Sequence, residues 1–203
     1  MLWTLVTRDQ FVTTSWSGGT TTQLAIGPEG ACYGERDFLW RLSSAKVELE
    51  HSDFTPLPDY NRLIATLKGE LTMKVGEGEP VSLVPYQVVS FDGGVPVESW
   101  GQCRDFNLML RKGKCQGALQ PLKLEAGAAL DWAAPVIAPP TLPGRVLAIY
   151  CGEGQVALPE DGVEAAAGQL LLCRQGEDSP VRLESAQGAR LMTAVIYLEE
   201  ALR

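Results

Sequence analysis

Two arginines and three smaller polar residues stand in otherwise apolar segments of this chain, where their side chains could bind a ligand. They are Arg41, Ser43, Arg62, Asp105 and Asn107. Arginine binds carboxylates through paired, charge-assisted hydrogen bonds, and an asparagine amide can recognise an amide or formyl oxygen. Two arginines beside one aspartate leave one positive charge unmatched. The set therefore predicts a pocket for a small carboxylate.

The same residues have a second interpretation that needs no ligand. An arginine and Asp105 could form a buried ion pair that braces the fold, because a buried carboxylate without a partner is costly. The two interpretations are compatible, and the sequence leaves both open. By default, Trp16 and Trp40 would be core or rim aromatic residues.

The chain has a single histidine, His51, and this limits the chemistry available to it. A metal site in a β-barrel commonly uses two or three histidines with a carboxylate, and a Ser-His-Asp or Cys-His arrangement would have only His51. No Gly-x-Ser-x-Gly motif is present, and the Gly18-Gly19 segment lacks the lysine and helix of a phosphate loop. We expect His51 at the surface or at a strand end, with no metal, no cofactor and no catalytic residue.

Composition narrows the class of protein further. The 203 residues are 45% hydrophobic and 21% charged, as in a globular protein with a sizeable core. The net charge of -8 and the scattered lysines and arginines argue against nucleic acid and against a membrane surface. No segment is long and apolar enough to span a membrane, and Met1–Phe11 does not resemble a signal peptide. Five cysteines without CxxC spacing favour reduced thiols, so we expect a cytoplasmic protein.

Alternating side chains place the polar residues on particular faces of predicted strands. The longest predicted strand is 38–50, and one of its faces carries Arg41, Ser43, Ala45, Val47 and Leu49. A face that is polar at one end and apolar further along is typical of a strand that lines a barrel. In the predicted strand 104–111, Asp105, Asn107 and Met109 share a face.

A turn between two apolar runs predicts a β-hairpin. The runs are 63–67 and 71–75, and Lys68-Gly69 separates them. Arg62 then stands at the mouth of the hairpin. The segments 2–6 and 10–16 are compatible with edge strands.

Two β-rich parts of the chain resemble each other. Gly69-Glu70-Leu71 has a counterpart in Gly152-Glu153-Gly154, and each part ends in a long apolar strand. Such duplication predicts an all-β fold of two stacked jelly-roll-like barrels. We expect an N-terminal barrel over 1–115, a connector over 116–143 and a C-terminal barrel over 144–203, with strands exchanged between the halves. An unpaired sheet edge would allow a homodimer.

Several motifs together resemble the HutD/Ves family of bacterial proteins. They are Trp16-x-Gly-Gly-x-Thr-Thr, Phe38-x-Trp-Arg-Leu-Ser-x-Ala, Asp53-Phe-Thr-x-Leu-Pro-x-Tyr-x-Arg62, Leu67-x-Gly, Phe91-Asp-Gly and Arg104-Asp-Phe-Asn-x-Met. The resemblance implies a bicupin, and it adds Trp40 to the candidate pocket residues Arg41, Ser43, Arg62, Asp105 and Asn107. The HutD branch is associated with histidine utilisation, which handles urocanate and formylated glutamate derivatives, and the Ves branch with stress and cold response. The motifs do not separate the two branches.

The leading hypothesis is a metal-free bicupin that binds a small anionic metabolite, of the formylglutamate or urocanate type, as a sensor or regulator. A second hypothesis is a metal-independent enzyme on a similar acid, with Asp105 as general base. It requires a raised pKa for Asp105, which a neighbouring arginine would oppose. A third hypothesis is a stress-related structural or interaction module in which the cluster only braces the fold. The absence of recognisable catalytic machinery favours binding over catalysis.

Overall fold

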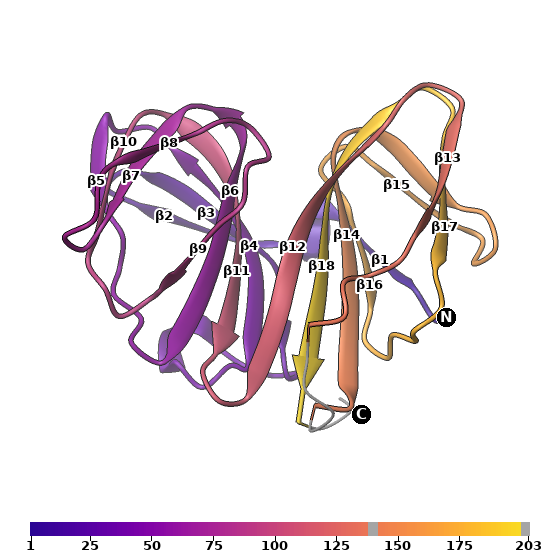
Figure 1. The fold of residues 1–203 in the computed structure, drawn as a ribbon, viewed down its shortest axis with the longest axis horizontal. Helices are drawn as coiled ribbons and strands as arrows, with labels where there is room; N and C mark the ends of the chain where they lie inside the picture. Colours follow the sequence, from indigo (N-terminus) through magenta and orange to yellow (C-terminus); the bar gives the residue numbers. More distant parts are fainter. Residues whose placement is uncertain (138–141, 200–203) are drawn as a thin grey trace. The chain divides into compact units, whose positions relative to one another are not determined.

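The computed structural model describes residues 1–137 and 142–199, and their regular structure is almost entirely β (Figure 1). The chain divides into a first unit, Phe11–Lys114, and a second unit formed by Met1–Gln10 with Cys115–Arg203. Neither of the two 3₁₀ helices in the described chain has the length and apolar character needed to cross a membrane. The predicted all-β class is confirmed.

The first unit contains two antiparallel sheets. The six-stranded sheet has the order β2-β3-β4-β11-β6-β9, and its strands are β2 (Val12–Trp16), β3 (Gly19–Gly27), β4 (Trp40–Val47), β11 (Cys103–Arg111), β6 (Tyr60–Gly69) and β9 (Val89–Asp92). The four-stranded sheet has the order β5-β10-β7-β8, and its strands are β5 (His51–Asp53), β10 (Val97–Trp100), β7 (Leu71–Val75) and β8 (Val81–Leu83). A 3₁₀ turn, η2 (Tyr33–Glu35), lies between β3 and β4. Among the described strands both sheets are open, since each order begins and ends at an edge strand.

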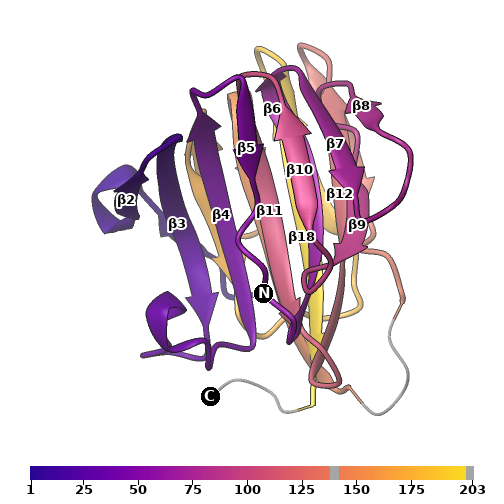
Figure 2. The same ribbon diagram turned by 90° about the vertical axis from the view of Figure 1, so that its left-hand side faces the viewer.

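The two sheets of the first unit pack against each other through apolar side chains. Ile64 on β6, Met73 on β7 and Val97 on β10 belong to one buried cluster. Figure 2 shows β5, β10 and β7 in front of β4, β11 and β6. The space between the sheets is therefore partly an apolar core, and the pocket described below opens beside it.

The predicted hairpin is wrong, although both of its strands exist. β6 and β7 follow one another through Gly69, but β6 pairs with β9 and β11, whereas β7 pairs with β8 and β10. Gly69 has a φ of +83°, and a Cβ at this position would lie 2.3 Å from the carbonyl oxygen of Gln102. The glycine thus forms a corner at which the chain leaves one sheet for the other.

The second unit contains one eight-stranded sheet and the 3₁₀ turn η1 (Arg8–Gln10). Its strands are β1 (Thr4–Val6), β12 (Cys115–Leu124), β13 (Ala128–Trp132), β14 (Gly144–Leu158), β15 (Val163–Ala166), β16 (Leu170–Cys173), β17 (Val181–Ser185) and β18 (Ala189–Leu198). β1 pairs with β16, so the N-terminal segment joins strands from the far end of the chain. Within the range expected to be a connector, β12 pairs with β18 and β13 with β17. Residues 138–141 of that range, and 200–203 of the expected C-terminal barrel, lie outside the described residues.

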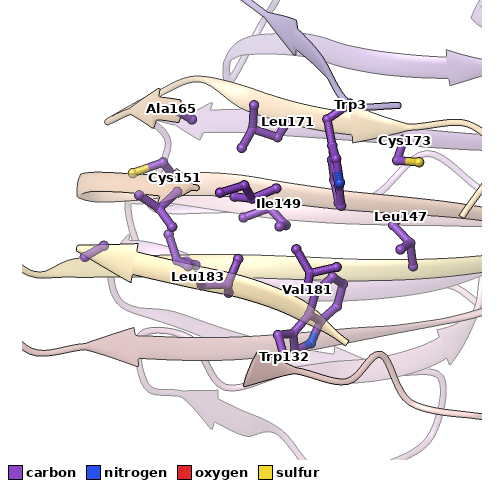
Figure 3. Packing of buried hydrophobic residues seen from close by; sticks show 14 of the residues in the cluster. Trp3, Trp132, Leu147, Ile149, Cys151, Ala165, Leu171, Cys173, Val181 and Leu183 are labelled. Atoms are coloured by element: carbon purple, nitrogen blue, oxygen red, sulfur yellow. The ribbon is translucent and has the colours of Figure 1, made fainter. Parts of the chain in front are cut away.

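Bulky side chains fill the interior of the second unit. Trp3 and Trp132 come from segments that are far apart in the sequence, and both point into the same cluster as Ile149 and Leu183 (Figure 3). All four are buried. This cluster forms an apolar core, in contrast to the polar face described next in the first unit.

Candidate functional site

Three neighbouring strands of the first unit bring the predicted polar residues together. In the register of β4, β11 and β6, Met109 pairs with Arg41 on one side and with Arg62 on the other. Two residues before Met109 on β11, Asn107 pairs with Ser43. Because side chains alternate across a strand, these residues project from one face of the sheet. The two arginines therefore flank a central strand at one level, and the amide lies one step along it.

This face lines a pocket of about 230 Å³, which lies entirely within the first unit. Five of the six predicted site residues line it: Arg41, Ser43, Arg62, Asp105 and Asn107. With about 30 Å³ for each water-sized group, the pocket has room for a small metabolite. The strands place the five residues as the alternation predicts.

Trp40 is the predicted site residue that does not line this pocket. It precedes Arg41 on β4, so its side chain lies on the opposite face, where it is fully buried. A Cβ at Gly27 would lie 2.3 Å from Trp40 Nε1, so the indole packs directly on the glycine backbone. In the structure Trp40 is a core residue behind the pocket.

Arg62 is a buried cation of the pocket, with 6% of its surface exposed. Its guanidinium carbon lies 4.9 Å from the ring centroid of Phe54 and 5.3 Å from that of Phe91. Nη1 donates to the carbonyl oxygen of Thr55 at 3.4 Å, while Nε has no hydrogen-bond partner among the described residues. Burial lowers the pKa of Arg62 to about 10, so the side chain still carries its charge at neutral pH. A buried cation with a free N–H group is suited to an anionic ligand.

Arg41 is held more fully by its neighbours. Its Nε donates to Gln23 Oε1 at 2.9 Å and its Nη1 to Ser43 Oγ at 3.3 Å. Its guanidinium carbon lies 4.1 Å from the ring centroid of Tyr33. Burial lowers the pKa of Arg41 from its ordinary value, and the nearby Tyr33 and Asp105 partly oppose that change. These contacts fix the direction of the guanidinium before any ligand binds.

Asp105 is buried on the same face and follows directly after a β-bulge, where the register of β11 shifts between Arg104 and Asp105. Its Oδ1 accepts a hydrogen bond from the backbone N–H of Ala45. Burial raises the pKa of Asp105 to about 6, although the Ala45 hydrogen bond, Arg62 and Arg41 all favour the ionised form. Above that pH the two arginines and Asp105 together carry one net positive charge.

The bracing interpretation predicts an ion pair between Asp105 and an arginine. Across the residues that the structure describes, no Asp105 oxygen lies within 4.0 Å of a nitrogen of Arg41 or Arg62. The arginines act on Asp105 at longer range, through their charge. The guanidinium groups are therefore not occupied by this carboxylate.

Asn107 adds a neutral polar group between the arginines and Asp105. It is 4% exposed, and its Oδ1 has no hydrogen-bond partner in the described part of the chain. An asparagine amide can offer either an acceptor oxygen or an N–H donor. The sequence predicts a contact between this amide and a ligand oxygen, but the atom without a partner is the acceptor Oδ1, which suits a ligand N–H or O–H group.

Three aromatic residues of the pocket were not selected from the sequence. Tyr33 lies in the 3₁₀ turn η2, and nothing in its local sequence marks it as a pocket residue. Phe54 lies within the Asp53-Phe-Thr motif, which could have indicated it. Trp16 lies in the Trp-x-Gly-Gly motif, and the sequence predicts only a core or rim position for it.

The all-β fold, with a pocket on the inner face of a sheet, defines a cupin-like protein. Three solved structures are similar to it. A conserved protein of unknown function from Pseudomonas aeruginosa PAO1 is 24% identical, with a TM-score of 0.77 over 97% of this chain and 99% of that chain. HutD from Pseudomonas fluorescens SBW25 is 20% identical, with a TM-score of 0.74 and the same coverage. The bacterial pirin YhhW from Escherichia coli, in complex with nickel(II), is 10% identical, with a TM-score of 0.67 and the same coverage.

The sequence itself identifies the family. The HutD family profile matches residues 8–192, which is most of the chain, and the chain therefore belongs to the HutD family. No match was found among curated proteins.

A metal ion, which many cupin-like proteins bind, does not fit the residues of this pocket. His51 begins β5 as an exposed residue, with its Nε2 3.8 Å from Glu98 Oε2, and it is not among the pocket-lining residues. No group of three His, Cys, Asp or Glu side chains suited to a metal occurs in 1–137 and 142–199. His51 is expected at the surface or at a strand end, and the structure places it at both.

Proposed function

We propose that this HutD-family chain binds a small carboxylate metabolite in the pocket between Arg41 and Arg62. The observation that carries the proposal is the state of Arg62: a charged, buried guanidinium whose Nε faces no acceptor in the described chain. A buried cation without a full set of acceptors is unfavourable unless a ligand supplies them. A carboxylate does so with two hydrogen bonds and a compensating charge.

The remaining pocket residues constrain the rest of the ligand. Asn107 and Ser43 lie one step along the sheet from the arginines, and Asp105 lies further along. A ligand whose acid group binds the arginines would place its next polar group near Asn107. An amino-acid derivative with an N–H group, such as a formylated glutamate, or an imidazole acid such as urocanate, has this pattern.

The family membership supports a role in histidine utilisation, and we propose a sensor or regulator of one of its intermediates. A bicupin, with a ligand-binding first unit and a second unit filled by Trp3 and Trp132, fits such a role. None of the five cysteines is joined to another by a disulfide, as in a reducing compartment, which supports a cytoplasmic location.

A metal-independent enzyme is the second candidate, and one observation favours it. The pKa of Asp105, raised to about 6, brings this carboxylate close to the range of a general base at neutral pH. The interaction module has less support, because the ion pair that would brace the fold is not formed between Asp105 and either arginine.

A thermal-unfolding screen tests the proposal directly. The panel is formylglutamate, urocanate, histidine, glutamate, formate and divalent metal ions. A ligand at one hundred times its dissociation constant adds about 2.7 kcal/mol to the free energy of unfolding, so we expect at least one carboxylate to raise the melting temperature clearly.

Each outcome of the screen has a consequence. Stabilisation by metal ions alone, or by no compound, would contradict the proposed function. If a stabilising acid is also consumed by the wild type but only bound by Asp105→Asn, the enzyme is the correct reading. If the acid is bound and recovered unchanged, the chain is a binding protein and not an enzyme for that acid.

A further inference from the structure

The Trp16 motif has no role in the function proposed so far, although its indole lines the pocket. Trp16 ends β2 and is 38% exposed, whereas Trp3, Trp40 and Trp132 are at most 6% exposed. A large apolar side chain that stays half open at the rim of a polar pocket is available to a ligand.

The turn that follows Trp16 holds the indole in one place. A Cβ at Gly18 would lie 2.1 Å from Trp16 Cζ3, so the ring lies directly on the glycine backbone. Gly19 has a φ of +145°, and a Cβ there would lie 1.9 Å from the carbonyl oxygen of Lys46. The carbonyl oxygen of Gly18 also accepts a hydrogen bond from the N–H of Glu48 at 2.8 Å. Both glycines are thus needed, one beneath the ring and one against β4.

The register of the sheet places this indole at the end of the pocket opposite the arginines. Trp16 pairs with Gly19, and Gly19 pairs with Val47 on β4. Arg41 lies six residues before Val47 on the same strand, about 20 Å away between Cα atoms. Arginine and tryptophan are long side chains, and both reach the same pocket. A ligand bound by the arginines through its acid group therefore directs its other end toward the indole.

We infer that Trp16 is a specificity-determining residue, and that it selects carboxylic acids with a planar, conjugated body over saturated acids of the same size. This inference rests on the proposed function, since it assumes that the arginines bind the acid group. An indole face attracts a flat π-system through stacking as well as through apolar contact, whereas a puckered saturated ring gains only the contact. Phe54 and Tyr33 add aromatic surface to the same pocket.

A pair of matched probes tests the inference. trans-Cinnamate and 3-cyclohexylpropanoate have the same charge and the same numbers of carbon and oxygen atoms, but only cinnamate is planar and conjugated. Calorimetric titration of the full chain should show tighter binding of cinnamate. Trp16→Ala should weaken cinnamate binding by about tenfold and 3-cyclohexylpropanoate binding much less, while Trp16→Phe should restore most of the difference.

Two further variants test whether the position of the Trp16 indole matters, and not only the presence of a tryptophan in this unit. Gly18→Ala keeps the indole but displaces it, and should lower the preference for cinnamate. Trp100→Ala removes a tryptophan of similar exposure, 36%, that does not line the pocket. This variant should bind both probes with the affinities of the wild type.

The possible failures point to different errors. Equal affinities of the wild type for the two probes, or an equal loss of both in Trp16→Ala, would overturn the inference. Binding of other carboxylates but of neither probe would also overturn it and leave the proposed function intact. If the wild type binds no carboxylate at all, both are wrong.

Discussion

Arg62→Gln is expected to weaken binding of the carboxylate ligand by about thirtyfold or more, the largest effect of any single substitution in the pocket. Glutamine keeps much of the length of the side chain but removes the charge and the paired N–H groups. Truncating one partner of a buried, hydrogen-bonded charge pair commonly costs at least ~2 kcal/mol of binding free energy. Arg62 is buried, so solvent screens the interaction between its charge and the ligand only weakly. Titration calorimetry with the best acid from the screen measures the loss.

The same variant distinguishes ligand binding from bracing. Arg62 forms no ion pair with Asp105 and is desolvated, so removal of its charge should leave the free energy of unfolding unchanged or raise it. A brace would instead lose several kcal/mol. Arg62→Lys keeps the charge without the planar fork and should fall between wild type and Arg62→Gln in affinity.

Arg145→Gln provides the matched control. Arg145 is also a buried arginine, 7% exposed, and its guanidinium carbon lies 5.4 Å from the ring centroid of Tyr197. It belongs to the second unit and pairs with Asp178. Its replacement should leave ligand affinity unchanged. An equal loss of affinity in Arg145→Gln and Arg62→Gln would mean that the effect arises from the fold and not from the pocket.

The faces of the pocket strands could be predicted because alternation is a local property. One polar face on β4 and one on β11 follow from the positions of Arg41, Ser43, Asp105 and Asn107 alone. The bulge between Arg104 and Asp105 does not disturb this result, because it lies before the polar positions. Alternation also separates Trp40 from Arg41, and the inclusion of Trp40 came only from the family motif.

The path of the chain between sheets could not be predicted in the same way. Gly69 satisfies the local requirement of a hairpin turn and that of a corner between two sheets equally well. What distinguishes them is the approach of Gln102 to Gly69, a contact between segments more than thirty residues apart. The position of Tyr33 has the same origin, because it depends on how the loop after β3 returns to Arg41.

The balance of charges inside the pocket is likewise a property of the folded protein. The sequence places an arginine and an aspartate on one face, and from this a lowered pKa of Asp105 would be expected. The structure shows the opposite direction, because burial outweighs the arginines when they act only at a distance. Distance and desolvation, which the sequence does not contain, determine the result.

Asp105→Asn is therefore expected to stabilise the protein at neutral pH and to lose that advantage in acid. The pKa of Asp105 rises from an ordinary value of 3.8 to about 6 on folding, so the folded protein holds a proton that the unfolded chain releases between these values. Stability from this group is complete below pH 3.8 and is lost as the pH rises through 6. The shift corresponds to about 3 kcal/mol at pH 7. Denaturant unfolding of both proteins from pH 4 to pH 7 should show the difference grow by an amount of this order.

Asp92→Asn is a control for which we expect the opposite change in the free energy of unfolding at neutral pH. Asp92 Oδ1 accepts hydrogen bonds from Lys112 Nζ at 2.6 Å and from the N–H of Gly94 at 2.8 Å, and these contacts lower the pKa of Asp92. Its stabilisation is present above pH 3.8 and is lost as the pH falls below that value, so Asp92→Asn should be less stable than wild type at neutral pH. If Asp105→Asn behaved like Asp92→Asn, Asp105 would be ionised and satisfied in the folded protein. That result would favour the bracing interpretation, because a close cationic partner can hold a buried carboxylate in its charged form.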